Sequence, residues 1–369
     1  MPRKPSSLPK KVLFALAVTL GFLLLLECGA RLFWTPPDHG EATALDAHPT
    51  RGWTLQDKAS SAGVSFRLGA HGLREVPRTG APHHILTTGD SSIFGHGLPD
   101  ADTLHIRLHT ALQGRNHHVD VLTAGVPGYT TAQTLDQMRA FGWAMAPQLL
   151  VVGNLWSDSN FDNEADTPIA PHHTGNHLPG QIEAPPPPNR PPPPSQSGFW
   201  MKNSRAVQML DAILRPSTPK TIDWITPDAP GGARRVPITD YAKNLDTLFS
   251  QAAERKIGAL FLLPCNRELA AEIPTPPKGW PWDVYFETAQ SVATAREVPI
   301  VNGCEIAKAK NLQGDAAFLD EMHPTAALNT AYAEAIADTL ITLGWPSNPL
   351  LPKQNAADLA VPPDPWAKP

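Results

Sequence analysis

The sequence predicts an α/β protein whose parallel sheet is covered by helices on both faces. Two observations favour this class: short apolar runs alternate with amphipathic stretches along most of the chain, and strands that alternate with helices form parallel sheets. A third observation is that the chemically distinctive motifs directly follow apolar runs or precede a helix. Parallel sheets carry their functional groups at the carboxyl ends of strands, so these motifs are expected to meet at one edge.

Five buried strands are expected, each a short apolar run bounded by polar or turn-forming residues. They cover residues 84–88, 118–123, 148–152, 258–263 and 299–301. Runs of this length and composition are typical of strands that are buried on both faces.

The helices between them are expected where apolar residues recur every three or four positions. Leu104, Leu108 and Leu112 define one such face, which ends at Gly114. Further helices are expected from about Thr131 to Met145, at 241–252, at 282–296 and at 328–343, with a short one at 206–214.

Residues 1–34 are predicted to be a membrane segment. Basic residues precede fifteen uncharged, mainly apolar residues at 12–26. That run resembles the core of a signal peptide, with residues 28–30 as a cleavage site. The segment can also extend to Trp34 if Glu27 and Arg31 lie at the outer interface, which favours an uncleaved anchor over a cleaved signal. Either way the basic flank stays cytoplasmic. We therefore expect a single-pass inner-membrane protein with its domain on the periplasmic, extracytoplasmic side.

The rest of the chain divides by composition. Residues 35–82 are polar and rich in Gly and Pro, which predicts an extended lead-in with a short strand near 64–68. Residues 83–345 form the predicted α/β domain, which a Pro-rich insertion interrupts at about 159–237. Residues 346–369 are a Pro-rich tail, and the 41 prolines of the chain are about twice the usual share.

Charge and composition argue against several partner classes. A net charge of −5 offers no basic field for nucleic acid. Three cysteines are too few for a disulfide scaffold. The histidines at 172–177 lie in a Pro-rich loop without regular ligand spacing, so neither a metal nor another cofactor is expected. Nothing in the sequence indicates the oligomeric state.

One disulfide is expected, between Cys265 and Cys304. Both cysteines lie just past the ends of strands that should be consecutive in the sheet. Neighbouring strands are near 4.8 Å apart, within the Cα spacing of a disulfide. Export would permit the oxidation.

A serine and a histidine–carboxylate pair stand at opposite ends of the domain. Ser91 follows the first strand in Gly89-Asp90-Ser91, where its hydroxyl should project from the sheet edge and its amide could stabilise an oxyanion. Asp320 and His323 are three residues apart before the last helix, a spacing that lets the carboxylate orient the imidazole. Each motif also has an ordinary interpretation: a strand-end turn for Ser91, and a helix cap by Asp320 beside an exposed histidine.

Together these motifs resemble those of the SGNH, or GDSL-type, hydrolases. The ordered set comprises Gly89-Asp90-Ser91, Gly125 and Asp320-x-x-His323, and it spans roughly residues 80–344. The resemblance implies a flavodoxin-like three-layer α/β/α fold with a five-stranded parallel sheet. It also implies a catalytic triad of Ser91, His323 and Asp320, with Gly125 as an oxyanion donor. Residues 71–74 (His-Gly-Leu-Arg) resemble the lead-in of membrane-anchored members.

The third motif of that family is altered in this chain. Members of the family carry an Asn-Asp after the third strand, and the asparagine amide donates to the oxyanion. Here the expected position is Ser157, followed by Asp158, while Asn154 and Asn160 are out of register. A hydroxyl can donate one hydrogen bond, but with less fixed geometry than an amide.

The resemblance therefore implies a carboxylic ester hydrolase that acts on acyl esters. Export would make O-acetyl or other acyl groups on envelope glycans or lipids the nearest substrates. An O-acyltransferase with the same triad differs only in the acceptor. A non-catalytic binding or assembly protein that has kept the fold is the other alternative, favoured by the altered third motif and the Pro-rich insertion.

Overall fold

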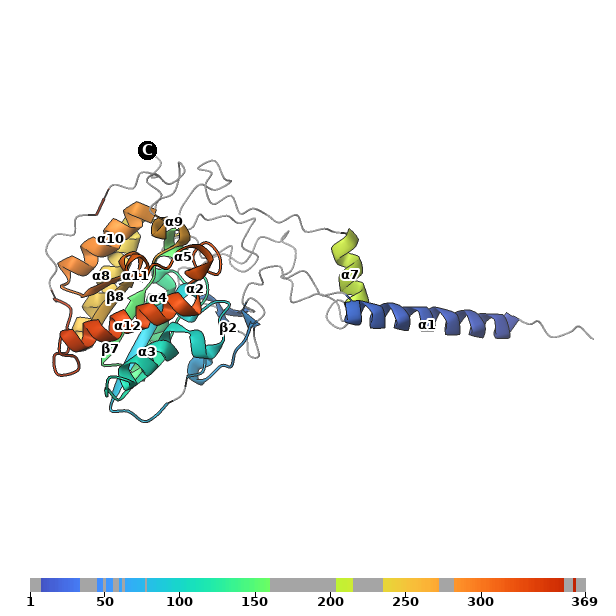
Figure 1. Ribbon diagram of the computed structural model, residues 1–369, viewed down its shortest axis with the longest axis horizontal. Coiled ribbons are helices and arrows are strands. Elements are labelled where there is room, and N and C mark those ends of the chain that lie inside the picture. The colour runs from blue at the N-terminus through green and yellow to red at the C-terminus, as the bar shows by residue number, and fades with distance from the viewer. Residues whose placement is uncertain are drawn as a thin grey trace, which may run out of the picture. The chain divides into compact units, whose positions relative to one another are not determined.

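The computed structural model divides into two compact units, Met1–Gly40 with Asn189–Ile222, and Glu41–Pro188 with Asp223–Pro369. It describes residues 8–33, 45–48, 51–55, 60–61, 64–76, 78–159, 204–214, 235–271, 282–354 and 361–362 (Figure 1). Most of the predicted Pro-rich insertion and tail lies outside these residues, so their boundaries remain predictions.

The larger unit is built on one five-stranded parallel sheet with the order β6-β5-β7-β8-β9. Its strands are β5 (His83–Gly89), β6 (Val119–Thr123), β7 (Leu149–Gly153), β8 (Gly258–Leu263) and β9 (Ile300–Asn302). The first strand along the chain lies second in the sheet, which is the flavodoxin-like order. Each strand matches its predicted range to within about two residues, and the predicted fold class is confirmed.

Helices cover both faces of the sheet because successive strand residues point to opposite sides. Ile85 and Leu86 illustrate this: they are both fully buried, but in separate apolar clusters. One cluster contains side chains of α4 (Thr131–Gln137), α8 (Ile238–Glu254) and α10 (Trp282–Ala295). The other contains side chains of α3 (Leu104–Gln113), α11 (Gly303–Ala309) and α12 (Ala326–Thr342).

Several helical elements at the sheet edge are shorter or less regular than the sequence predicts. The helix that starts at Thr131 is α-helical only to Gln137, and a π turn (Met138–Gly142) and a 3-10 turn (Trp143–Met145) continue it. Short helices also follow the strands; they are α2 (Ser91–Phe94), α5 (Trp156–Ser159), α9 (Arg267–Ala270) and α11. Elements of one turn are too short to produce an apolar periodicity in the sequence.

The lead-in contains more structure than the single strand expected near 64–68. Two antiparallel pairs occur, β1 (Leu45–His48) with β2 (Gly52–Leu55) and β3 (Ser60–Ser61) with β4 (Val64–Ser65). Trp53 and Leu55 are buried against Phe94 and Tyr129, and so attach the lead-in to the chain around the sheet edge. This alternation of buried residues covers too few positions to stand out against the Gly- and Pro-rich background.

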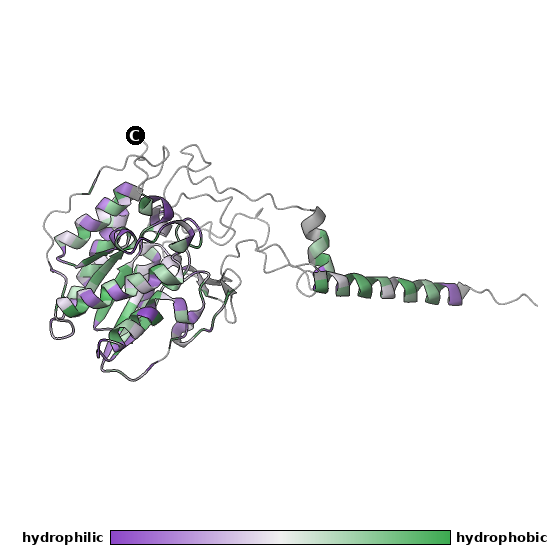
Figure 2. Ribbon diagram, viewed as in Figure 1, coloured by the Kyte–Doolittle hydropathy of each residue, from purple (hydrophilic) through white to green (hydrophobic). Residues whose placement is uncertain are grey.

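The smaller unit contains the N-terminal helix α1 (Leu8–Phe33) and α7 (Arg205–Leu214). Within α1, the 23 residues Lys10–Leu32 are long and apolar enough to cross a membrane, although a signal sequence would meet the same criteria. In Figure 2 most of this helix is coloured as hydrophobic. Its large side chains are exposed, with Leu13 at 70% and Leu25 at 73%.

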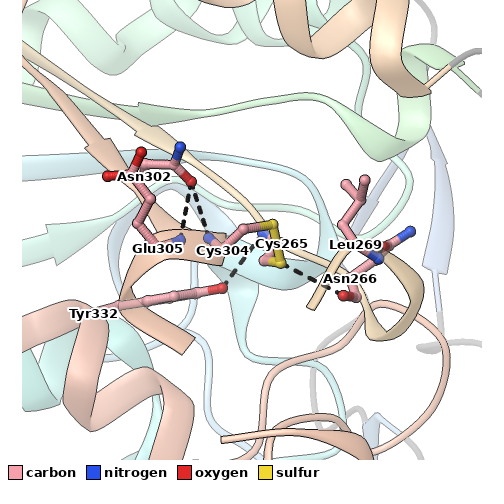
Figure 3. The surroundings of a disulfide bond; sticks show 7 residues. All are labelled: Cys265, Asn266, Leu269, Asn302, Cys304, Glu305 and Tyr332. Carbon is pink, nitrogen blue, oxygen red and sulfur yellow. Dashed lines mark hydrogen bonds between the residues drawn. A yellow bond between two sulfur atoms is a disulfide. The ribbon is translucent and has the colours of Figure 1, made fainter. Parts of the chain in front are cut away.

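The predicted disulfide between Cys265 and Cys304 is present, with a Cα–Cα distance of 4.8 Å (Figure 3). It joins the chain just after β8 to the first turn of α11. The Asn302 carboxamide oxygen accepts hydrogen bonds from the amides of Cys304 and Glu305, and the Tyr332 hydroxyl accepts one from the Cys265 amide. The disulfide therefore links the chain after β8 to α11, two segments that these hydrogen bonds already hold in place.

Reduction of this disulfide should destabilise the protein. The bond closes a loop with a sequence separation of 39 residues, and the chain-entropy model assigns such a loop about 4 kcal/mol. Urea unfolding with and without reductant, and of Cys304→Ser, should show a loss of that order in the free energy of unfolding. If both thiols of the native, unreduced protein react with an alkylating reagent, the bond does not form.

Candidate active site

The serine lies at a tightly packed turn where β5 ends and α2 begins. A Cβ on Gly89 would come within 2.5 Å of Ile93, and one on Gly125 within 2.7 Å of the Phe94 amide nitrogen. A side chain therefore does not fit at Gly89, inside this turn, or at Gly125, in the loop that packs against it. Ser91 is the first residue of α2, so its amide lies at the positive end of that short helix.

Asp90 fixes this turn from inside the protein. It is fully buried, and one carboxylate oxygen caps α2 by accepting a hydrogen bond from the Ser92 amide at 3.0 Å. The other oxygen accepts from the Ser157 amide at 3.3 Å, which joins the turn to the loop after β7. Burial raises the pKa of Asp90, while these amide hydrogen bonds act in the opposite direction.

The predicted histidine and carboxylate, His323 and Asp320, form a continuous chain of hydrogen bonds with Ser91. His323 Nε2 is 2.7 Å from Ser91 Oγ, and His323 Nδ1 is 2.6 Å from Asp320 Oδ2. An ionised carboxylate can only accept hydrogen bonds, so Nδ1 carries the proton and Nε2 is the acceptor for the serine hydroxyl. This is the arrangement that a general base needs in order to activate a hydroxyl.

Asp320 is held in its ionised form. Burial raises its pKa, but the hydrogen bond to His323, the charge of that ring and the amides of Met322 and His323 outweigh burial and lower it. Both amides donate to Asp320 Oδ1 at 2.9 Å. The alternative role as the cap of the last helix is wrong, because Thr325 caps α12 by accepting from the Leu328 amide.

A second histidine, His96, lies against His323 and was not predicted. The rings of His96 and His323 have centroids 4.4 Å apart and are tilted by 37°. Burial, and then the charge of His323, lower the pKa of His96 to about 4. The His96 ring is therefore neutral at physiological pH. Its position five residues after Ser91, between two glycines, was the available signal.

Arg267 holds the loop that carries Asp320 and His323. Its amide donates to the Glu321 carbonyl at 2.9 Å, and its guanidinium donates to the carbonyls of Asp320 and Phe318, both at 3.1 Å. The guanidinium also pairs with Asp315 at 2.7 Å. Since Arg267 follows the disulfide-bonded Cys265 by two residues, the loop is held from a fixed point of the sheet edge.

Arg74 supports the other side of the site. Its side chain is almost fully buried, and it donates to the carbonyls of Phe94 and Gly95 at 3.1 Å and of Leu98 at 2.6 Å. It also pairs with Asp100 at 2.7 Å. Arg74 is the last residue of the lead-in motif at 71–74. Its hydrogen bonds fix the backbone of the segment that follows Ser91.

Gly125 lies beside α2, as expected of an oxyanion donor. Its amide donates to Thr123 Oγ1 at 3.2 Å, so a substrate oxygen would have to replace or share that hydrogen bond.

The loop after β7 offers Ser157 rather than an asparagine. Its amide is bound to Asp90, which leaves only the hydroxyl as a further donor. Asn154 is buried and its side-chain amide nitrogen donates to Thr134 Oγ1 at 3.0 Å, so Asn154 does not take the place of the family's oxyanion asparagine. Asn160 lies outside the described residues.

Asp158 is buried immediately next to Ser157. Its carboxylate accepts from the Thr131 hydroxyl at 2.5 Å and from the Thr131 amide at 2.9 and 3.1 Å, which ties the β7 loop to the start of α4. Burial raises its pKa to about 7, and the hydrogen bonds of Thr131 only partly offset that effect. The aspartate of the altered third motif is therefore a buried structural link.

Within the described ranges, no cluster of three or more His, Cys, Asp or Glu side chains could hold a metal ion. The histidines at 172–177 lie outside those ranges.

Comparisons with known proteins give structural neighbours only. No family model and no curated protein matches the sequence. Among solved structures, the chain is similar to the acetylxylan esterase Axe2 from Geobacillus stearothermophilus, with 14% identity over 72% of this chain and 95% of that one and a TM-score of 0.43. A lipase/acylhydrolase from Enterococcus faecalis matches at 13% identity over 74% and 100%, with a TM-score of 0.42.

A G-D-S-L family protein from Desulfitobacterium hafniense is similar over 70% of this chain and 99% of its own, at 11% identity and a TM-score of 0.42. The neighbours thus include proteins of the family that the motifs resemble. At this level of similarity they carry no further argument, and the chemistry of the site is argued from its own geometry.

Replacing Arg267 should impair turnover more than binding. Arg267→Ala removes two hydrogen bonds that hold the loop of the base, so kcat of any Ser91-dependent reaction should fall by roughly 10- to 100-fold with little change in KM. Arg115→Ala is the matched control, because Arg115 also pairs with an aspartate and donates to a carbonyl, but it follows α3 and its partners are Asp338 of α12 and Ala111 of α3. A wild-type kcat for Arg267→Ala would contradict the positioning role.

Asp158 should make stability depend on pH. Its pKa is about 7 in the folded protein and about 4 in an unfolded chain. Between these values the folded state binds more protons, so the free energy of unfolding falls as pH rises through this window. Asp158→Asn should flatten that dependence in urea unfolding at several pH values, whereas Asp338→Asn, at an exposed carboxylate, should not. Equal slopes for all three proteins would show that Asp158 does not titrate there.

Proposed function

We propose that the protein is a serine ester hydrolase in which Ser91 is the nucleophile, His323 the general base and Asp320 the residue that orients it. The observation that carries the proposal is the continuous chain of hydrogen bonds from Ser91 Oγ through His323 to Asp320, with donor–acceptor distances of 2.7 and 2.6 Å. Three groups from two ends of the chain meet in the order and geometry that this chemistry requires. The resemblance of the motifs to SGNH hydrolases supports the same assignment.

The proposed reaction has two steps. Ser91 Oγ attacks the ester carbonyl carbon while its proton moves to His323 Nε2, and the negative charge develops on the carbonyl oxygen. When the intermediate collapses, the alcohol leaves with the proton from His323. Water then attacks the carbonyl carbon of the acyl-serine while one of its protons moves to His323 Nε2. As the bond between that carbon and Ser91 Oγ breaks, His323 returns the proton to Oγ and the carboxylic acid is released. Asp320 stays ionised and stabilises the imidazolium that forms in each step.

The oxyanion is proposed to bind the amides of Ser91 and Gly125, with the Ser157 hydroxyl as the third donor. Burial of Ser157 and the hydrogen bond from its amide to Asp90 keep this residue next to the nucleophile turn. The hydroxyl would replace the asparagine amide of the related family at this place.

We further propose that α1 anchors the protein in the inner membrane, with the α/β domain on the extracytoplasmic side. The basic N-terminal flank and the length of Lys10–Leu32 support this placement, and the Cys265–Cys304 disulfide fits an oxidising compartment. Acyl or O-acetyl esters of envelope glycans or lipids are then the nearest substrates. Transfer of the acyl group to a sugar hydroxyl would use the same residues.

The three proposed catalytic groups should act as one unit. Ser91→Ala and His323→Ala should each lower kcat for p-nitrophenyl esters by roughly four to six orders of magnitude, and the double variant should be little worse. Asp320→Asn should cost less, because the imidazole still reaches Ser91. Ser91→Ala should also lose labelling by a fluorophosphonate probe. A folded Ser91→Ala protein with wild-type turnover would exclude hydrolysis at this site and favour a non-catalytic binding protein.

Ser157 tests the third oxyanion donor separately. Ser157→Ala should lower kcat, by up to about 100-fold if the hydroxyl contributes like other such donors, with KM nearly unchanged. Ser157→Asn should preserve or raise kcat, because an amide restores the usual donor. If Ser157→Ala turns over like the wild type, backbone amides alone bind the oxyanion.

Acetyl release from envelope polysaccharide, with and without added sugar acceptor, distinguishes hydrolysis from transfer.

A further inference from the structure

The membrane helix α1 carries a carboxylate that is bound to a second helix. Glu27 accepts hydrogen bonds from the Ser204 hydroxyl at 2.7 Å and from the amides of Arg205 and Ala206 at 3.1 and 3.0 Å. These groups form the N-terminus of α7, which lies more than 170 residues further along the chain. Arg31, one turn further along α1, donates to the same carboxylate at 2.7 Å.

This arrangement explains a charged residue within an apolar helix. A carboxylate near the membrane is costly unless it is paired and hydrogen-bonded. The amides of the first turn of α7 and the positive end of its helix dipole satisfy Glu27 on one side, and Arg31 satisfies it on the other. Glu27 and Arg31 lie towards the C-terminal end of α1, the level at which the helix would leave the bilayer.

The direction of α7 is the second observation. α1 and α7 belong to the same compact unit, and Figure 1 shows α7 crossing the C-terminal end of α1 steeply rather than running beside it. If α1 spans a bilayer, a helix in this position lies along the membrane surface. A crosswise helix at the end of a membrane span is the geometry of an interfacial helix.

The sequence of α7 suits this position. Its residues, Arg-Ala-Val-Gln-Met-Leu-Asp-Ala-Ile-Leu, place the apolar residues on one half of a helix and the glutamine and aspartate on the other. Leu210, in the apolar half, is 54% exposed. Within the described residues α7 packs against α1, and this packing leaves Leu210 exposed.

We propose that α7 is a second membrane contact, lying in the outer headgroup region with Leu210 and its apolar half towards the acyl chains. The partner is the lipid bilayer itself. The proposal rests on the membrane anchorage proposed above for α1, and it adds a contact made by the insertion between β7 and α8. Glu27 is the residue that fixes α7 at the correct depth.

The test uses the full-length protein in phosphatidylcholine vesicles. A Cys28→Ser background removes the free, exposed cysteine, and Leu210→Cys then carries an environment-sensitive fluorophore. We expect quenching by lipids with a shallow nitroxide to exceed quenching by aqueous iodide several-fold. The matched control is Asp211→Cys, which lies on the polar half of the same helix by sequence, and it should show the reverse order.

Glu27→Ala in the Leu210→Cys protein tests the depth-fixing role. It should reduce lipid quenching at least twofold while the protein still floats with the vesicles; unchanged quenching would overturn this role. If the protein floats but the Leu210 probe is quenched by iodide like the Asp211 probe, the second contact is overturned and the α1 anchor stands. If the protein does not float, the anchor and the inference both fail. Ester turnover of each variant should equal that of the background protein.

Discussion

The buried carboxylate of Asp90 is the interaction on which the geometry of the site depends. It has two oxygens and uses them for different segments: one closes the turn that presents Ser91, and the other takes the Ser157 amide after β7. A buried ionised group is costly unless its hydrogen bonds are satisfied. The same cost favours contact between the two loops, because separating them would remove the Ser157 amide from one carboxylate oxygen and leave only the Ser92 amide on the other.

Around this point the edge of the sheet is held together by side chains other than the proposed catalytic groups. Arg74, in the lead-in, holds the chain that follows Ser91, and Arg267, after β8, holds the chain at Asp320. Asp158 joins the third loop to α4 through Thr131. Each support uses charge-assisted hydrogen bonds to backbone groups or a hydroxyl, which fix position without placing another reactive group beside the nucleophile.

The sequence was sufficient to predict the sheet, its order and the residues that meet at its edge. Strands such as β7 and β8 are continuous apolar runs, and long helices such as α8 have a clear period, so both leave a signal. The place of His96 between two glycines, five residues after Ser91, was its only signal, because its contact with His323 depends on how two distant loops fold onto each other. The lead-in strands and one-turn helices were missed for a related reason: their burial comes from packing with distant segments rather than from local periodicity.

The distance in sequence between Ser91 and His323 has a consequence for how the protein is made. The two residues are 232 positions apart, and His323 belongs to the last loop before the final helix. A nascent chain that emerges from the ribosome therefore contains Ser91 long before His323 has been synthesised. The arrangement of Ser91, His323 and Asp320 cannot form until nearly the whole domain has been synthesised and has folded.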